Sequence, residues 1–279
     1  MSPISRIRDR LTDGEDRLPL GLTLLSAAIA ATLVLPLGWL VIEAVTVDPA
    51  RAIDLTLSVR TAETVLNSLL LMVGVTALSI AIGVPLAYLT ARTDLPFRRF
   101  WAVTAALPLV VPSYVGAFSF VSAFGPQGEF HEVLSPLGIE RVPEIYGLSG
   151  SILVITLYTY PYVYLTTRAA LLSFDTTLLE AARTLNHGRL ASFRKVTLPA
   201  IRPAVAAGSL LAALYAVSDF GTPSIMRLSV FTRQIYVEYR SFGSDYAALL
   251  SLQLLVVVLF VLALEWLVRS DASSHGDDA

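Results

Sequence analysis

The sequence predicts an all-α membrane protein with six transmembrane helices. Its residues are 55% hydrophobic and only 15% charged, and its mean hydropathy of +0.68 lies far above that of soluble domains. Long runs without charge also separate the charged residues, and each run reaches the roughly 20 residues that a helix needs to cross a bilayer. The predicted spans are residues 18–42, 64–91, 100–128, 145–167, 203–226 and 246–264, of which the fifth is interrupted by Asp219.

The basic residues predict how these spans are oriented. With six spans, 14 of the 20 Lys and Arg residues lie on the same side as the N-terminus, so the positive-inside rule places both ends in the cytoplasm. Residues 1–17 and 269–279 are then cytoplasmic tails, and residues 18–268 form the membrane domain. Four arginines precede the first run as in a signal peptide, but the run is too long for one, and we interpret it as an uncleaved span.

The segments between the spans differ in character. Residues 47–63 are expected to form a short outer loop, and residues 92–99 a short inner loop with three arginines. Residues 124–145 contain too many Gly and Pro residues for a regular spanning element. In the fourth span, "LYTYPYVYL" predicts a helix kinked at Pro161, whose Tyr160 and Tyr162 either pack against other helices or line a translocation pathway.

The polar segment between the fourth and fifth spans predicts a short amphipathic helix. Thr177 and Glu180 have the spacing of a capping box, and Asn186 is a residue type that suits a helix end. The helix has about eight residues and a length of roughly 12 Å. Its apolar stripe is Leu178, Ala181, Ala182 and Leu185. A helix this short is stable only if its apolar face is covered by the lipid surface, by the chain's own helices or by another protein. Its alanines favour a protein partner over the lipid surface.

This segment resembles the EAA loop of binding-protein-dependent ABC importer permeases, through "EAA" at 180–182 and "VTLP" at 196–199. The resemblance implies the type I permease fold, with a core at about residues 64–268 and a coupling loop at 174–199. It also implies that the loop docks on a separate ATPase subunit. The coupling residues would be Glu180, Ala181, Ala182, Arg183, Leu185, Asn186, Leu198 and Pro199, with Asn186 where the family has Gly.

Longer segments such as "GVPLAYLTARTDLPFRRFW" and "RPAVAAGSLLAALYAVSDFGTPSIM" look like the N-terminal half of iron(III) permeases, relatives of thiamine permeases. The resemblance implies import by alternating access, with iron(III) as the first candidate and thiamine, phosphonate or another small solute as alternatives. The implied partners are an ATPase dimer, an extracytoplasmic solute-binding protein, the lipid bilayer and a second permease half. That half would be a second copy, another chain or a missing C-terminal part. The protein would be a multi-pass component of a prokaryotic cell membrane.

We expect no catalysis and no cofactor in this chain. It lacks the phosphate-binding G-x-x-x-x-G-K-[ST] motif, so ATP and Mg²⁺ would bind to the partner ATPase. The spread of its charges gives no indication of nucleic-acid binding. "GLSG" around Ser149 matches an intramembrane serine protease motif, but the sixth span has no His to activate the hydroxyl. A secondary transporter remains an alternative, although it would not explain the capped short helix.

Two further groups of polar residues were considered as sites. Asp219 is the only acid inside a predicted span, and because Gly221 and Pro223 follow it, it either ends a helix or lines the pathway. Glu129, His131 and Glu132 have the side chains of a metal site, but a single His with two Glu residues is more typical of a solvated loop. We therefore predict no metal site.

Overall fold

The computed structural model describes residues 20–125, 128, 145–173, 197–241 and 243–274, and these residues form helices with no strand among them. The long helices are α2 (Leu20–Val45), α4 (Val59–Arg92), α8 (Gly147–Ser173), α11 (Leu198–Ser218) and α14 (Ser244–Ser274). The short ones are α3 (Pro49–Thr56), α5 (Arg98–Thr104), the 3-10 helix η1 (Leu107–Val110), α6 (Ser113–Phe124), α12 (Gly221–Ile225) and α13 (Phe231–Arg240). Among the described residues, five helices are long and apolar enough to span a membrane, or six if one bent pair is a span. The all-α membrane fold is thus confirmed.

The third predicted span is not one helix. The chain bends by 91° between the segment Arg98–Val110, which contains α5 and η1, and α6. Pro112 explains the break, because proline lacks a backbone N–H and disfavours the helical conformation in the preceding residue. Val111 is accordingly extended, with φ −94° and ψ 124°. The span predicted at residues 100–128 is therefore a bent pair of helices, and it is a sixth span only if the pair crosses the membrane as one.

Two other predicted boundaries also need correction. The fifth span was placed at residues 203–226, but α11 already begins at Leu198 and ends at Ser218, just before Asp219. The expected outer loop at residues 47–63 is largely helical. It contains α3, which begins with a side-chain cap from Asp48 to the Arg51 amide at 3.0 Å and with Pro49 in the first turn.

The packed centre of the bundle consists of α4, α8 and α11. Two glycines let these helices approach closely: a Cβ added at Gly208 of α11 would lie 2.7 Å from Val163 Cα, and one at Gly83 of α4 would lie 3.0 Å from the Tyr160 carbonyl oxygen. A buried hydrogen bond joins the hydroxyls of Ser79 and Thr159 at 3.1 Å. Small residues and hydroxyl pairs of this kind are how helices associate in lipid.

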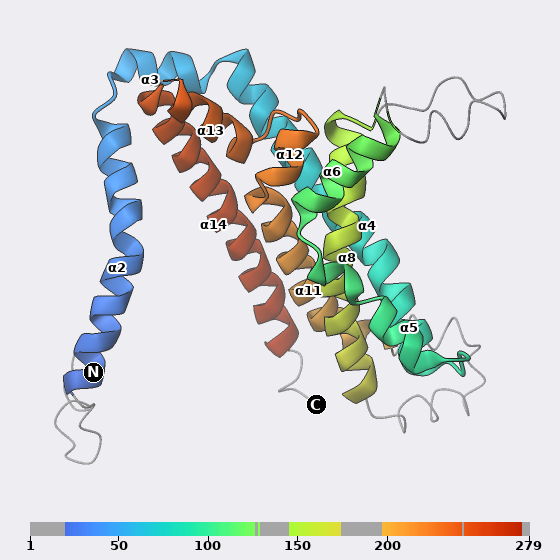
Figure 1. Cartoon of the computed structure of the whole chain (residues 1–279). Helices are drawn as coiled ribbons and strands as arrows, with labels where there is room; N and C mark the ends of the chain where they lie inside the picture. The colour runs from blue at the N-terminus through green and yellow to red at the C-terminus, as the bar shows by residue number, and fades with distance from the viewer. Residues whose placement is uncertain (1–19, 126–127, 129–144, 174–196, 242, 275–279) are drawn as a thin grey trace.

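Helix α2 stands apart from this centre and packs mainly against α14 (Figure 1). The most apolar part of α2 has no buried residue. The starts of α2 and α11, the helix α5 and the end of α14 lie at one end of the bundle, whereas α3, α12 and α13 lie at the other (Figure 1). We call these the α5 end and the α13 end. The placement of the α5 end in the cytoplasm stays a prediction from the basic residues.

Candidate functional site

Asp219 connects three short elements at the point where α11 ends. Its carboxylate accepts hydrogen bonds from the Ser113 hydroxyl at 3.1 Å and from the Gly221 amide at 3.0 Å. Its backbone carbonyl accepts a third from the Thr232 hydroxyl at 2.8 Å. Because these donors belong to α6, α12 and α13, the half-buried Asp219 fixes the α11 break against its neighbours. The structure therefore places Asp219 at a helix end, one of the two roles that the sequence left open.

The end of α11 lies against the bend that precedes α6. Gly221, the first residue of α12, approaches Tyr114 so closely that an added Cβ would be 2.6 Å from the Tyr114 Cβ. Ser113 and Tyr114 form the first turn of α6, directly after the 91° bend. The end of the α11 span thus meets the bent pair of helices around one carboxylate, and transporters also build solute sites at interrupted helices.

The two tyrosines chosen as pathway candidates are both half-buried and lie in the packed part of α8. Tyr160 packs against a cluster that includes Ala87, Tyr164 and Ile201. The ring of Tyr162 lies 6.3 Å from that of Tyr215, one turn before the end of α11. These contacts account for both side chains as packing residues, and whether either one also meets solute stays a prediction. Helix α8 continues without interruption through Pro161.

Tyr164, which the sequence did not single out, is the most completely buried tyrosine of this group. Its hydroxyl lies 3.2 Å from the Thr90 hydroxyl and donates to the Ala102 carbonyl at 3.2 Å. It thereby joins α8 to α4 and to α5. Nothing in the local sequence distinguishes Tyr164 from its neighbours, because its partners lie 74 and 62 residues away.

Most of the predicted coupling loop lies outside the described residues. This applies to Glu180, Ala181, Ala182, Arg183, Leu185 and Asn186, and also to the outer-loop residues Glu129, His131 and Glu132. The loop's last three residues are described: Thr197 is buried, Leu198 begins α11 with Pro199 in the first turn, and Leu198 packs against the cluster around Ala87 and Tyr164. The end of the loop is thus attached to the packed centre of the bundle.

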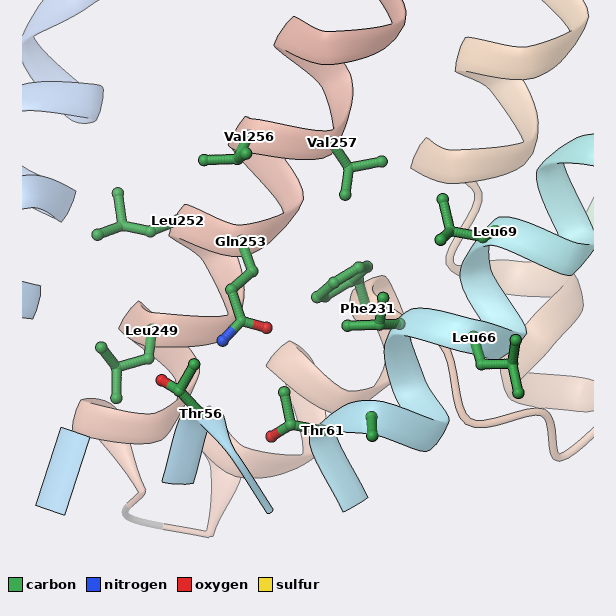
Figure 2. Close-up of a pocket in the computed structure, with 12 residues that line it drawn as sticks. Thr56, Thr61, Leu66, Leu69, Phe231, Leu249, Leu252, Gln253, Val256 and Val257 are labelled. Atoms are coloured by element: carbon green, nitrogen blue, oxygen red, sulfur yellow. The ribbon is translucent and has the colours of Figure 1, made fainter. Parts of the chain in front are cut away.

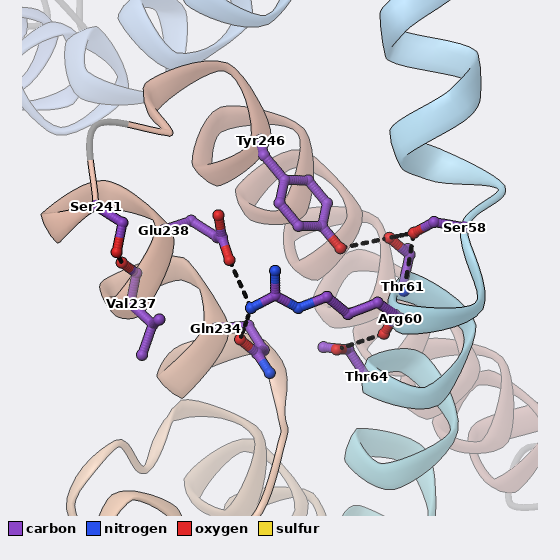
Figure 3. Close-up of polar contacts among 9 residues, drawn as sticks. All are labelled: Ser58, Arg60, Thr61, Thr64, Gln234, Val237, Glu238, Ser241 and Tyr246. Atoms are coloured by element: carbon purple, nitrogen blue, oxygen red, sulfur yellow. Dashed lines mark hydrogen bonds and ion pairs between the residues drawn. The ribbon is translucent and has the colours of Figure 1, made fainter.

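A polar clamp at the α13 end was not predicted (Figure 3). Arg60 of α4 lies 2.7 Å from Glu238 and donates to Gln234 at 3.2 Å, and both partners belong to α13. Beside it, the hydroxyls of Thr61 and Tyr246 lie 2.7 Å apart and join α4 to α14. A second ion pair, between Arg51 and Asp245 at 3.4 Å, joins α3 to α14. The clamp therefore holds α13, which follows the end of α11, to the start of α4, and the neighbouring contacts hold α4 and α3 to the start of α14.

The described residues contain no group of three or more His, Cys, Asp or Glu side chains that could hold a metal ion. The Asp219 carboxylate is a single acid surrounded by hydroxyl and amide donors. The arrangement can bind and orient a polar solute or hold two helix ends, but its described groups do not form a metal-ligand set.

The sequence matches a family model described as "Binding-protein-dependent transport system inner membrane component" over residues 79–270. One relative is an Fe(3+)-transport system permease protein from Haemophilus influenzae, 32% identical over 88% of this chain but over only 45% of the relative. Another is a probable molybdenum ABC transporter permease protein from Haloferax volcanii, 35% identical over 81% of this chain and 82% of the relative. The chain thus spans less than half of the first relative's length and most of the second's.

Solved structures have the same fold. A bacterial alginate ABC transporter, in complex with a periplasmic protein that carries an alginate pentasaccharide, matches with a TM-score of 0.68 at 19% identity, over 88% of this chain and 92% of the other. The MetNI methionine ABC transporter in an inward-facing conformation matches with a TM-score of 0.60 at 16% identity, over 76% and 95% of the two chains. Together with the family match, which covers well over half of the sequence, these findings show that the chain belongs to the inner-membrane permease components of binding-protein-dependent ABC importers, a family of transport components.

Proposed function

We propose that this chain is the membrane-spanning subunit of an ABC importer that moves iron(III) into the cytoplasm by alternating access. The relatives transport different solutes: beside the Fe(3+) permease stand permeases for molybdenum and, in Salmonella typhimurium, for sulfate. The choice between a cation and an oxyanion therefore has to come from this chain's own residues.

The Asp219 carboxylate is the observation that favours a cation. It lies where the α11 span ends against the bent pair of helices, and neither the Arg60–Glu238 nor the Arg51–Asp245 ion pair includes it. A negative charge beside a translocation pathway attracts cations and repels oxyanions such as molybdate and sulfate. Thiamine is also a cation, and only the likeness to the Fe(3+) permease favours iron over it. Phosphonate, as an anion, is disfavoured by the same charge.

The proposed partners follow from the family. A pair of ATPase subunits, which would bind ATP and Mg²⁺, engages the coupling loop 174–199 and drives the change of access. An external binding protein delivers the solute at the α13 end, as a periplasmic protein does in the alginate transporter complex. Since the chain spans only 45% of the Fe(3+) permease, we propose that a second permease half, a second copy or another chain, completes the pathway.

Solute uptake by cells that lack this chain tests the proposal. Loss of the chain should abolish the ATP-dependent accumulation of radioactive iron(III), and leave molybdate uptake unchanged. Lost molybdate uptake with normal iron uptake would replace iron(III) by the oxyanion. Uptake that continues after the ATPase subunit is removed would instead indicate a secondary transporter.

Glu180 tests the coupling role in particular. We expect Glu180→Ala to lower solute-stimulated ATP hydrolysis in reconstituted vesicles while membrane insertion stays normal. Glu180→Gln is the matched control, because glutamine can still cap the helix but carries no charge. Normal coupling in both variants would remove Glu180 from the interface, whereas normal coupling in Glu180→Gln alone would reduce its role to capping.

A further inference from the structure

A groove of about 670 Å³ lies between α4 and α14 near the α13 end (Figure 2). Its volume is in the range of small-molecule sites, roughly 300 to 1,000 Å³. Each wall is one face of a spanning helix, since the residues on it recur at intervals of three or four. The principal wall residues are Val65, Leu66 and Leu69 of α4 and Leu252, Val256 and Val257 of α14. The groove is therefore built between two spans and is almost wholly apolar.

The groove is open at the surface of the helix bundle. At its rim Leu66 and Val256 are 56% and 65% exposed, whereas Phe231, which also lines it, is only 1% exposed. The groove residues on α4 run from Thr61 to Leu69, a distance of about 12 Å along the helix. That distance is somewhat less than half of a roughly 30 Å hydrocarbon core, so the groove fits within one leaflet.

The groove has a polar end. Gln253 lies on the otherwise aliphatic face of α14, and its Oε1 is buried without a hydrogen-bond partner. Figure 2 shows its amide turned toward Thr56 and Thr61, at the opposite end of the groove from Val256 and Val257. An unsatisfied amide at membrane depth is costly. Whatever fills the groove should therefore bring a polar group to this end and a hydrocarbon to the other.

We propose that the groove binds a phospholipid from the leaflet at the α13 end. One acyl chain lies along Leu66, Leu69 and Val257, and the glycerol region hydrogen-bonds to the Gln253 amide, which can donate as well as accept. Helix α3 brings the Arg51 side chain to the same end, where it is 64% exposed beside Asp245 and has further N–H donors for a phosphate. This order of basic, polar and apolar groups matches that of a lipid from head to tail.

A helix of a second copy is the competing occupant. A helix from a second copy would cover the exposed rim at Leu66 and Val256, but it would satisfy the Gln253 amide only if it carried a polar residue at that depth. A phospholipid carries a polar glycerol region directly beside its acyl chains. The proposal does not depend on which solute the chain transports.

Photo-crosslinking to a labelled lipid tests this site. The full chain is reconstituted in vesicles of phosphatidylethanolamine and phosphatidylglycerol that contain a phospholipid with a diazirine on its acyl chain, and the labelled peptides are mapped by mass spectrometry. Labelling should concentrate on the groove faces of α4 and α14. Val257→Trp, which fills the groove, should reduce it to background, and Leu259→Trp, an exposed position on the same helix outside the groove, should leave it unchanged. Gln253→Leu, which removes one hydrogen bond, should lower it about fivefold.

The outcomes separate lipid from protein as the occupant. Labelling that is distributed uniformly around α14 would contradict the proposed lipid site. Labelling that neither Val257→Trp nor Gln253→Leu changes would contradict it as well. If Gln253→Leu instead lowers the fraction of cross-linked dimers without changing lipid labelling, a second copy fills the groove and the proposal is wrong. Should Val257→Trp fail to fold, as judged by gel filtration, Leu66→Trp at the exposed rim of α4 makes the same test.

Discussion

In the centre formed by α4, α8 and α11, the helices pack closely because glycines lie at their contacts. Around Asp219, by contrast, the helix ends are joined by hydrogen bonds. Gly83 and Gly208 leave no room for a methyl group at the centre. At the break, Asp219 accepts three hydrogen bonds from three different elements. Substitutions that add side-chain volume should therefore lower stability most at the centre. Substitutions that remove charge or hydrogen bonds should have their effect around Asp219.

The largest effect is expected at the centre. Gly208→Ala places a methyl group 2.7 Å from Val163 Cα, and the backbone cannot move aside easily, so we expect a loss of about 2 to 3 kcal/mol in the free energy of unfolding. Gly38→Ala in α2 is the matched control, because its Cβ would meet nothing within 4 Å. Unfolding in mixed micelles measures both. Equal stability of the two variants would mean that the helices are not packed through Gly208.

At the break, Asp219→Asn should leave the fold intact and lower the rate of solute uptake about fivefold. Uptake should slow because asparagine lacks the negative charge that we propose attracts the cation. The amide can still accept the hydrogen bond from Ser113, so the free energy of unfolding should change by at most roughly 1 kcal/mol. Uptake in reconstituted vesicles measures the effect, with unfolding in micelles as the control. Wild-type uptake in Asp219→Asn would remove the carboxylate from the pathway and leave it as a helix end alone.

A smaller effect is expected at the clamp. Glu238 is 14% exposed, but Arg60 is 51% exposed, so solvent screens their ion pair. A double-mutant cycle with Arg60→Met and Glu238→Gln should give a coupling energy of about 0.5 to 1 kcal/mol in the free energy of unfolding. This coupling should decrease at high salt. A salt-independent coupling would instead point to packing of the arginine stem.

The smallest effect is expected for Arg51 and Asp245. Their atoms are 3.4 Å apart, and the two side chains are 64% and 38% exposed. The same type of cycle, with Arg51→Met and Asp245→Asn, should give a coupling energy of at most about 0.3 kcal/mol. A value as large as that of the Arg60–Glu238 pair would show that the whole α13 end is shielded from water in the assembled protein.

The sequence predicted the spans because hydropathy depends on local composition, but it did not predict how spans break. Pro112 and the Asp219–Gly221 stretch are both local signals of a helix end. A search for long uncharged runs does not use these signals, because it considers only charge and hydropathy. The Asp48–Pro49 start of α3 was likewise a readable helix signal inside a segment that we expected to be a loop.

The site residues that the sequence missed depend on long-range contacts. Arg60 and Glu238 are 178 positions apart in the sequence, and neither is unusual in its own segment. Gln253, by contrast, carried a local signal as a lone amide on an aliphatic helix face. The EAA segment was assigned from its motif alone, and its coupling role remains a prediction.

The isolation of α2 has a consequence for the order in which the bundle assembles during synthesis. A helix with no buried residues in its apolar part gains nothing from the packing of the centre, so it can sit in the bilayer on its own while the later spans are made. Its main neighbour is α14, which begins only at Ser244. The first described span can therefore pack against its main neighbour only after the last span has been made. A ribosome that stalls before α14 would leave α2 in the membrane without this partner.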